Sequence, residues 1–520
     1  MLILITVGIL LVSALGLLIL QIVSPDFRYT WLFAAGGALT AWISLLLWQI
    51  AMPVTLQLPA WQPDVIFTQS PLFLADGISW AFSLSLGTVC IGVIITAVAR
   101  ENFPSPVNWL GIFLLTSFGI LAVTAENPLT LVLLWAAIDL SELVSQMRFA
   151  EDPKLNERIV VSFASRVTGT LVLLWASMVS ASNGSVLNFH SPPPSAGLFL
   201  ILAAGLRLGV LPLHLPYAGE SAVRRGFGTC LRMISAGSSL ILLTRIPLSG
   251  VESPLTPYLM IFTSAAAVYG GWMWLRSPDE ITGRPFWLIG LGSLAVAAAL
   301  RGNPVGAAAW SCALILSGGA LFLASAQSRW MERVLFIGVW GISALPFSLT
   351  ANGWVSERPG FWYATPLLLI AHALLLAGYI RQSQRASVRT NFDDRPIWAK
   401  NVYPFGIYVI LFTLLLLGFY GWSGSLQIGN WISGIAASIL TFGLLWLTPR
   451  LRILNPVRAH WVRPTNPNWL DAIYQALWNI YRQAGRISNT FSKVLEGESG
   501  IMWTLFFLAL FISIFSQRTP

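Results

Sequence analysis

Six side chains that could carry or hold charge lie inside apolar stretches of this sequence. They are Asp139, Glu142, Arg166, Arg207, His214 and Arg232. A charge at the centre of a membrane helix costs about 2.5–3.5 kcal/mol on insertion scales, and such residues commonly pair inside a bundle or line an ion path. The sequence therefore predicts a buried charge cluster in which acids and arginines neutralise one another.

The two acids belong to one apolar stretch, with Asp139 three residues before Glu142. This spacing places both carboxylates on one helical face. We expect Asp139 to face Arg207 and Arg232. For Glu142, which lies nearer the end of its helix, we favour the simpler reading of a helix end where the carboxylate meets water or Arg148.

The remaining candidates have two readings each. Arg166 either joins the cluster or extends to the membrane interface, as long cationic side chains often do. His214 titrates near neutral pH, which makes it the best candidate for carrying a proton, but a structural histidine in a turn is equally compatible with the sequence. His372 stands alone in an apolar stretch, and we expect a structural role for it.

The stretch Ala203–Arg245 contains two of the arginines and a turn interrupted by Pro212. Proline removes a backbone donor and ends or kinks a helix. Broken helices at membrane depth occur where the freed backbone is buried in protein or lines a polar cavity. We therefore expect a discontinuous helix next to Arg207.

The composition requires many helices to place these residues in a bilayer. Of 520 residues, 56% are hydrophobic and 10% are charged, whereas soluble domains carry about 25% charge. The chain is thus predicted to be an all-α polytopic membrane protein. Its net charge of +9 comes from basic residues in loops, which favours membrane orientation over nucleic-acid binding.

About sixteen membrane helices are expected, because a hydrocarbon core needs about 20 apolar residues per helix. The first, Leu2–Val23, lacks a basic start and a cleavage site, which favours a membrane helix over a removed signal. The expected spans are 2–23, 29–52, 76–98, 107–124, 128–147, 159–180, 196–213, 226–246, 255–275, 284–300, 304–326, 334–350, 361–380, 404–422, 428–448 and 501–516.

Most basic loop residues, such as Arg148, Lys154 and Arg158, follow odd-numbered helices. This asymmetry predicts cytoplasmic loops there and both termini outside, in a prokaryotic inner membrane. Between the last two spans, segment 449–500 is polar. Leu470, Ile473, Leu477 and Ile480 recur in it at helical spacing, which indicates an amphipathic helix lying along the membrane or on neighbouring helices, or else a simple tether.

No motif for enzyme chemistry stands out. Cys90, Cys230 and Cys312 form no spaced pair, so neither a disulfide nor a metal site is expected. No phosphate-binding loop or nucleophile elbow occurs, so we expect no catalytic residue and no cofactor. A lipid-linked glycosyltransferase would need clustered acids in an outer loop, where only Asp64 and Asp76 are available.

Several motifs resemble the antiporter-like membrane subunits of respiratory complex I, which are related to subunits of Mrp cation/proton antiporters and membrane-bound hydrogenases. The motifs are 74–79 (LADGIS), Arg207 before 211–214 (LPLH), 235–237 (SAG), 345–347 (LPF) and the amphipathic segment followed by a final helix. The resemblance covers most of the chain, although each motif is degraded.

The resemblance implies two inverted five-helix repeats, each with a discontinuous helix. The expected organisation is N-terminal helices in 1–106, a first repeat in 107–246, a second repeat in 255–380 and two helices in 404–448. The amphipathic segment 449–500 and a final helix in 501–520 follow.

The departures from the family concern its proton relay. The family's glutamate position on the fifth helix is Ala136 here, its seventh-helix lysine is Arg207, and its eighth-helix histidine is Thr229. Arginine stays protonated, whereas a buried lysine can lose its proton. The eleventh helix, at 313–323, contains nothing titratable. The resemblance therefore implies a degraded relay with reduced or lost proton conduction.

We therefore expect an antiporter-like subunit of a multisubunit ion-translocating complex of the complex I, Mrp or hydrogenase type. Its partners would be other membrane subunits, the lipid bilayer, and protons or sodium ions, with no nucleic acid. It would have no chemistry of its own, although it could belong to an NADH:quinone oxidoreductase-like complex. The alternatives are a purely structural membrane scaffold and a stand-alone cation/proton antiporter.

Overall fold

The computed structural model describes most of the chain up to Leu447. Within 2–447 the residues not described are 25–26, 28, 60–69, 101–103, 148–152, 218–224, 247, 326–328, 357–359, 385–395, 421 and 423–427, and beyond 447 only 475–476, 479 and 482–483 are described. The chain divides into Met1–Val462 and Arg463–Pro520. The expected final helix at 501–516 and nearly all of the amphipathic segment lie outside the described residues.

Fifteen α-helices are described in the first unit. They are α1 Leu2–Val23, α2 Thr30–Ala51, α3 Gly77–Thr96, α4 Pro106–Thr124, α5 Pro128–Met147, α6 Pro153–Ser182, α7 Gly197–Leu208, α8 Arg225–Leu243, α9 Thr256–Arg276, α10 Glu280–Leu300, α11 Pro304–Leu323, α12 Arg329–Gly341, α13 Thr365–Gln384, α14 Ile397–Tyr420 and α15 Ile428–Leu447. Short 3₁₀ turns occur at η1 Ala97–Ala99, η2 Pro194–Ala196 and η3 Leu248–Val251.

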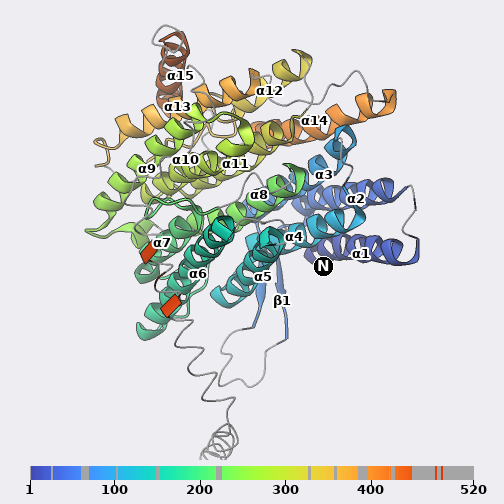
Figure 1. Cartoon of the computed structure of the whole chain (residues 1–520). Coiled ribbons are helices and arrows are strands. Elements are labelled where there is room, and N and C mark those ends of the chain that lie inside the picture. Colours follow the sequence, from blue (N-terminus) through green and yellow to red (C-terminus); the bar gives the residue numbers. More distant parts are fainter. Residues whose placement is uncertain are drawn as a thin grey trace, which may run out of the picture. The chain divides into compact units, whose positions relative to one another are not determined.

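Thirteen of the helices in the described part are long and apolar enough to cross a membrane. The predicted all-α polytopic membrane class is therefore confirmed. The first fifteen expected spans each correspond to one helix, most within a few residues, because a run of about 20 apolar residues fixes both the length and the position of a membrane helix. In Figure 1 the long helices lie alongside one another in a bundle.

Two helices end well before their expected ends, and both are followed by a proline turn. The span expected at 196–213 ends at Leu208, and the span expected at 334–350 is a helix from Arg329 to Gly341. These expected bounds were wrong because apolar composition continues through each turn, although the backbone leaves the helix at Gly209 and before Pro346. Ala344 and Phe347 have positive φ angles of 56° and 58°.

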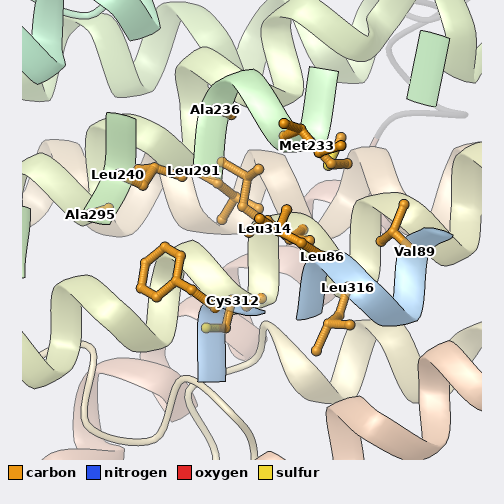
Figure 2. Close-up of a cluster of buried hydrophobic side chains, with 14 of the residues drawn as sticks. Leu86, Val89, Met233, Ala236, Leu240, Leu291, Ala295, Cys312, Leu314 and Leu316 are labelled. Carbon is orange, nitrogen blue, oxygen red and sulfur yellow. The ribbon is translucent and has the colours of Figure 1, made fainter. Parts of the chain in front are cut away.

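Four helices form the apolar centre of the first unit. α3, α8 and α11 pack on one another, and α10 packs on α8 and α11. In Figure 2, Leu86 of α3, Met233 and Leu240 of α8, Leu291 of α10 and Leu314 of α11 converge in this region. A helix that is apolar on all sides is stable only when it is surrounded, and every residue of the most apolar stretch of α10 is buried.

A small antiparallel sheet, which the sequence did not lead us to expect, precedes α3. Strand β1 Val54–Gln57 pairs with β2 Leu72–Ala75, and Phe73 forms an isolated bridge with Ala125 before α5. Asp76 then caps α3 by accepting a hydrogen bond from the backbone N–H of Ser79 (2.9 Å). We call this end of the bundle, where α3 and α5 begin and α4 and α8 end, the sheet side.

Candidate functional site

Asp139 on α5 contacts two arginines from two other helices. Arg207 of α7 binds the carboxylate in a bidentate manner, donating from Nη1 to Oδ2 (2.7 Å) and from Nη2 to Oδ1 (3.0 Å). Arg166 of α6 donates from Nε to the same Oδ1 (3.1 Å). All three side chains are almost completely buried. Such charge-assisted pairs are roughly twice as strong as neutral hydrogen bonds.

Glu142 lies one turn further along α5 and is fully buried. Its Oε1 accepts a hydrogen bond from Arg166 Nη1 (3.0 Å) and one from Arg232 Nη1, and Gln146 Nε2 donates to it as well (3.0 Å). The reading that we favoured from the sequence, a carboxylate at a helix end in water, was therefore wrong. The neighbouring helices α6 and α8 cover this face of α5 and supply the arginines.

The charge cluster therefore consists of Asp139, Glu142, Arg166, Arg207 and Arg232. It joins α5, α6, α7 and α8, which are neighbours in the bundle. Three arginines face two carboxylates, which leaves one positive charge in excess. Asp139 is eleven residues into α5, about 16 Å along the helix axis at 1.5 Å per residue, so the cluster is near the middle of this span.

The end of α7 brings Arg207 to Asp139. Arg207 is the penultimate residue of α7, and Gly209 follows with φ of +73°. A Cβ at Gly209 would lie 2.3 Å from the carbonyl oxygen of His214, so this turn requires glycine. On the facing helix, a Cβ at Gly169 would lie 2.6 Å from Arg207 Cγ. The absence of a side chain at Gly169 therefore lets α6 approach α7.

Two aromatic rings cover the guanidinium groups. Arg207 Cζ lies 4.1 Å from the centre of the Trp135 ring, and Arg232 Cζ lies 4.4 Å from the centre of the Tyr217 ring. Cation–π contacts of this kind stabilise cations that have lost their water. Neither ring was among the predicted site residues, although Trp135 precedes Asp139 by four residues and so shares its face of α5.

His214 lies beside the charge cluster without bonding to its acids. Its Nδ1 is 2.8 Å from the carbonyl oxygen of Pro212, and the positive charge of Arg166 acts on the imidazole ring. Its Nε2 is buried and has no hydrogen-bond partner among the described residues. The geometry therefore leaves both readings of His214, carrier and structural histidine, open as predictions.

A second group of charges lies on the sheet side. Arg245 donates from Nη2 to Asp76 Oδ1 (2.9 Å) and from Nη1 to Oδ2, so it links the end of α8 to the start of α3. Burial alone would raise the pKa of Asp76, but the hydrogen bond and charge of Arg245 outweigh this and lower it. Glu126 accepts the backbone N–H of His190 at Oε1 (2.7 Å), and burial raises the pKa of this carboxyl.

The C-terminal half places fewer titratable side chains at membrane depth. His372 of α13 is fully buried, with Nε2 2.7 Å from the carbonyl oxygen of Ile342 and the Trp310 ring 5.0 Å away. Tyr379 donates to the carbonyl oxygen of Ser317 (3.1 Å). Arg284 is also fully buried, in the second turn of α10. Among the described residues, no group of three or more metal-ligating side chains could hold a metal ion.

Comparison with known proteins gives matches among solved structures. A chain of the Mrp complex from a Dietzia species matches with a TM-score of 0.70 at 14% identity, over 100% of this chain and 63% of that chain. A chain of the membrane-bound sulfane sulfur reductase, an archaeal respiratory membrane complex, matches with a TM-score of 0.59 at 12% identity, over 99% and 100%. A chain of respiratory complex I from Thermus thermophilus matches with a TM-score of 0.58 at 15% identity, over 80% and 97%.

The chain has the fold of these membrane-complex chains. The predicted resemblance to the antiporter-like subunits is thereby confirmed at the level of the fold, and the chain is an integral membrane protein. It spans 63% of the length of the Mrp chain that it matches. No protein-family model matches the sequence, and no curated protein matches it.

Proposed function

We propose that this chain is an antiporter-like membrane subunit of a multisubunit ion-translocating complex, in which proton conduction is reduced or lost. The observation that carries the proposal is the buried charge cluster beside the break after α7. Burying five charged side chains at membrane depth is expensive unless they pair, and proteins built as inverted repeats commonly place ion sites at broken helices. The solved structures with this fold are chains of membrane complexes, and we infer from them that this chain also belongs to such a complex.

The cluster is suited to holding charge rather than passing protons. Asp139 accepts three hydrogen bonds from arginines, so donors already occupy both of its oxygens. Arginine does not release its proton in proteins. Glu142 is less completely bonded, because its Oε2 is buried and has no hydrogen-bond partner among the described residues.

The scarcity of polar side chains along much of α11 supports the loss of conduction. Figure 2 shows apolar side chains of α8, α10 and α11 packed on one another, among them Leu240, Leu291 and Leu314. A proton relay needs donors and acceptors within about 3 Å or one bridging water. In α11, residues 313–323 offer only the Ser317 side chain for such a contact, so α9 to α13 would not conduct.

Native electrophoresis of the tagged chain, solubilised mildly from its source membrane, tests the assembly part of the proposal. We expect migration in a complex several times the mass of the 520-residue chain, with other membrane subunits co-purifying. Migration as a monomer would contradict it. Genes beside its own, whether for redox modules or for Mrp-type partners, would indicate which complex it joins.

A purely structural scaffold is the second candidate, and the scarcity of polar side chains along residues 313–323 of α11 favours it over a stand-alone antiporter. The two readings differ in whether the charge cluster affects ion movement. Glu142→Gln distinguishes them in the purified complex. Unchanged proton flux with intact assembly supports the scaffold, whereas a loss of flux supports residual conduction in the N-terminal half.

We place the protein in a prokaryotic inner membrane with both termini outside, which site-directed labelling of introduced cysteines would test.

A further inference from the structure

Glu126, between α4 and α5, fastens the connection between α6 and α7 to the sheet side. Its Oε1 accepts the backbone N–H of His190 (2.7 Å), and its backbone carbonyl oxygen accepts that of Phe189 (2.8 Å). Its own N–H donates to the carbonyl oxygen of Leu72 in β2 (2.9 Å). Among the described residues, segment 186–192 makes no other hydrogen bond to the rest of the chain. Glu126 is therefore the polar anchor of this connection.

The carboxyl of Glu126 is incompletely bonded. Its Oε2 is buried and has no hydrogen-bond partner among the described residues, and the whole residue is 4% exposed. Arg245, whose positive charge acts on Glu126, already binds both carboxylate oxygens of Asp76. The group of Asp76, Glu126 and Arg245 thus carries one negative charge in excess when Glu126 is ionised, and a proton on Glu126 removes it.

Burial decides the direction in which this carboxyl responds to pH. Burial raises the pKa of Glu126, the charge of Asp76 acts in the same direction, and Arg245 and His190 oppose the shift without cancelling it. If segment 186–192 lifts away, water reaches the carboxyl and its pKa returns towards the ordinary 4.5. The closed arrangement therefore binds a proton more tightly than the open one, and protons stabilise it. Because the carboxyl can titrate in the open form, the burial of Oε2 in the closed form does not prevent this response.

The connection leads directly into the helix that carries Arg207. It ends in η2, and α7 begins at the next residue, Gly197. A Cβ at Gly197 would lie 2.3 Å from the carbonyl oxygen of Gly250 in η3, so the start of α7 is closely packed. α7 has 12 residues, about 18 Å at 1.5 Å per residue, and Arg207 is the penultimate one. One short helix therefore joins the connection held by Glu126 to the charge cluster.

We propose that Glu126 is a pH-sensitive latch: the connection between α6 and α7 closes on protonated Glu126 and opens more often when Glu126 is ionised. The start of α7 is then held more firmly when the sheet side is acidic. The latch adds a pH response to the fold, and it does not depend on the proposed function.

Spin-label mobility in the full-length chain, reconstituted in nanodiscs, tests the proposal. A nitroxide on Val186→Cys reports on the connection, because Val186 is 70% exposed and the three native cysteines are buried. We expect the mobile fraction to rise about twofold or more between pH 5 and pH 8. A label on Leu255→Cys, at the exposed turn before α9, should show no change.

Three variants identify the group that titrates. Glu126→Gln keeps an oxygen for the N–H of His190 but has no charge, so its mobile fraction should stay low at every pH. Glu252→Gln is the matched control, since Glu252 is an exposed acid directly after η3, and it should respond like the wild type. His190→Gln should also respond like the wild type, because the latch uses the backbone N–H of His190 and not its ring.

A second label tests whether the latch reaches α7. Ser195 is exposed in η2, directly before α7. A label on Ser195→Cys should show the same direction of change with pH as the label at position 186. A response at 186 without one at 195 would overturn the claim that the latch holds the start of α7.

Other outcomes would overturn the latch itself. In the wild type, a mobile fraction at position 186 that stays constant or falls as pH rises would show that protons do not favour closure. A response that persists in Glu126→Gln or disappears in His190→Gln would assign the titration to another group. The wild-type titration is decisive even if a variant does not fold.

Discussion

The carboxylate of Asp139 holds two buried guanidiniums, and Asp139→Asn should therefore destabilise the protein strongly. The change removes one negative charge from a cluster that already has one positive charge in excess. An asparagine amide offers one oxygen, whereas Asp139 uses both of its oxygens to accept from Arg166 and Arg207. Its NH₂ group would instead face a guanidinium that also donates.

Breaking a buried ion pair from one side costs about 3–5 kcal/mol, because the remaining charge stays buried. We expect a loss of this size in the free energy of unfolding. The double variant Asp139→Asn/Arg207→Gln restores the net charge of the cluster. Its cost should be less than the sum of the single variants, with a coupling energy of about 1–3 kcal/mol for residues in direct contact.

Unfolding in mixed micelles, in which sodium dodecyl sulfate is titrated into dodecyl maltoside and tryptophan fluorescence is followed, measures these differences. Asp279→Asn is a suitable control, since Asp279 caps α10 by accepting from two backbone N–H groups and asparagine caps about as well. A loss below about 1 kcal/mol for Asp139→Asn, with additive effects in the double variant, would refute the idea that this pair is a buried, energetically coupled unit.

Three further predictions follow from other sites. His372→Ala should leave any proton flux of the assembled complex unchanged, as measured by dye quenching in vesicles, because one histidine cannot bridge about 30 Å of hydrocarbon core; a clear loss of flux with intact assembly would show that the second half conducts. Glu126→Gln should raise the melting temperature at neutral pH, because burial raises the pKa of Glu126 and the folded state then disfavours the ionised form. The gain should shrink as pH falls through the raised pKa of the folded state and be lost below the ordinary value of 4.5; a gain that is independent of pH would contradict this cause. Gly169→Ala should cost about 1–3 kcal/mol by pushing Arg207 and α7 away, whereas Gly36→Ala, where a Cβ meets nothing within 4 Å, should be neutral or stabilising; equal effects would refute the close packing of α6 on α7.

The sequence was sufficient to predict the helices because each is an apolar run bounded by polar residues or proline. It also indicated that the acids of α5 share one face, since their spacing is local. It did not show that Glu142 is covered, because the arginine that reaches it from α8 is 90 residues away in the chain. Solvent exposure near a helix end depends on which neighbours pack there, and spacing alone carries no such information.

The small sheet was not predicted from the sequence. Residues 54–58 alternate apolar and polar side chains, but a four-residue strand is too short to stand out between long apolar helices.

Proton transport by the purified chain alone, reconstituted in liposomes with an imposed sodium or potassium gradient, tests the central claim most directly. We expect no more proton movement than in empty liposomes, because the cations of the charge cluster are arginines, which do not release their protons, and residues 313–323 of α11 offer only the Ser317 side chain as a polar contact. Cation-driven proton exchange by the lone chain, abolished by Asp139→Asn in folded protein, would show instead that it is a complete antiporter.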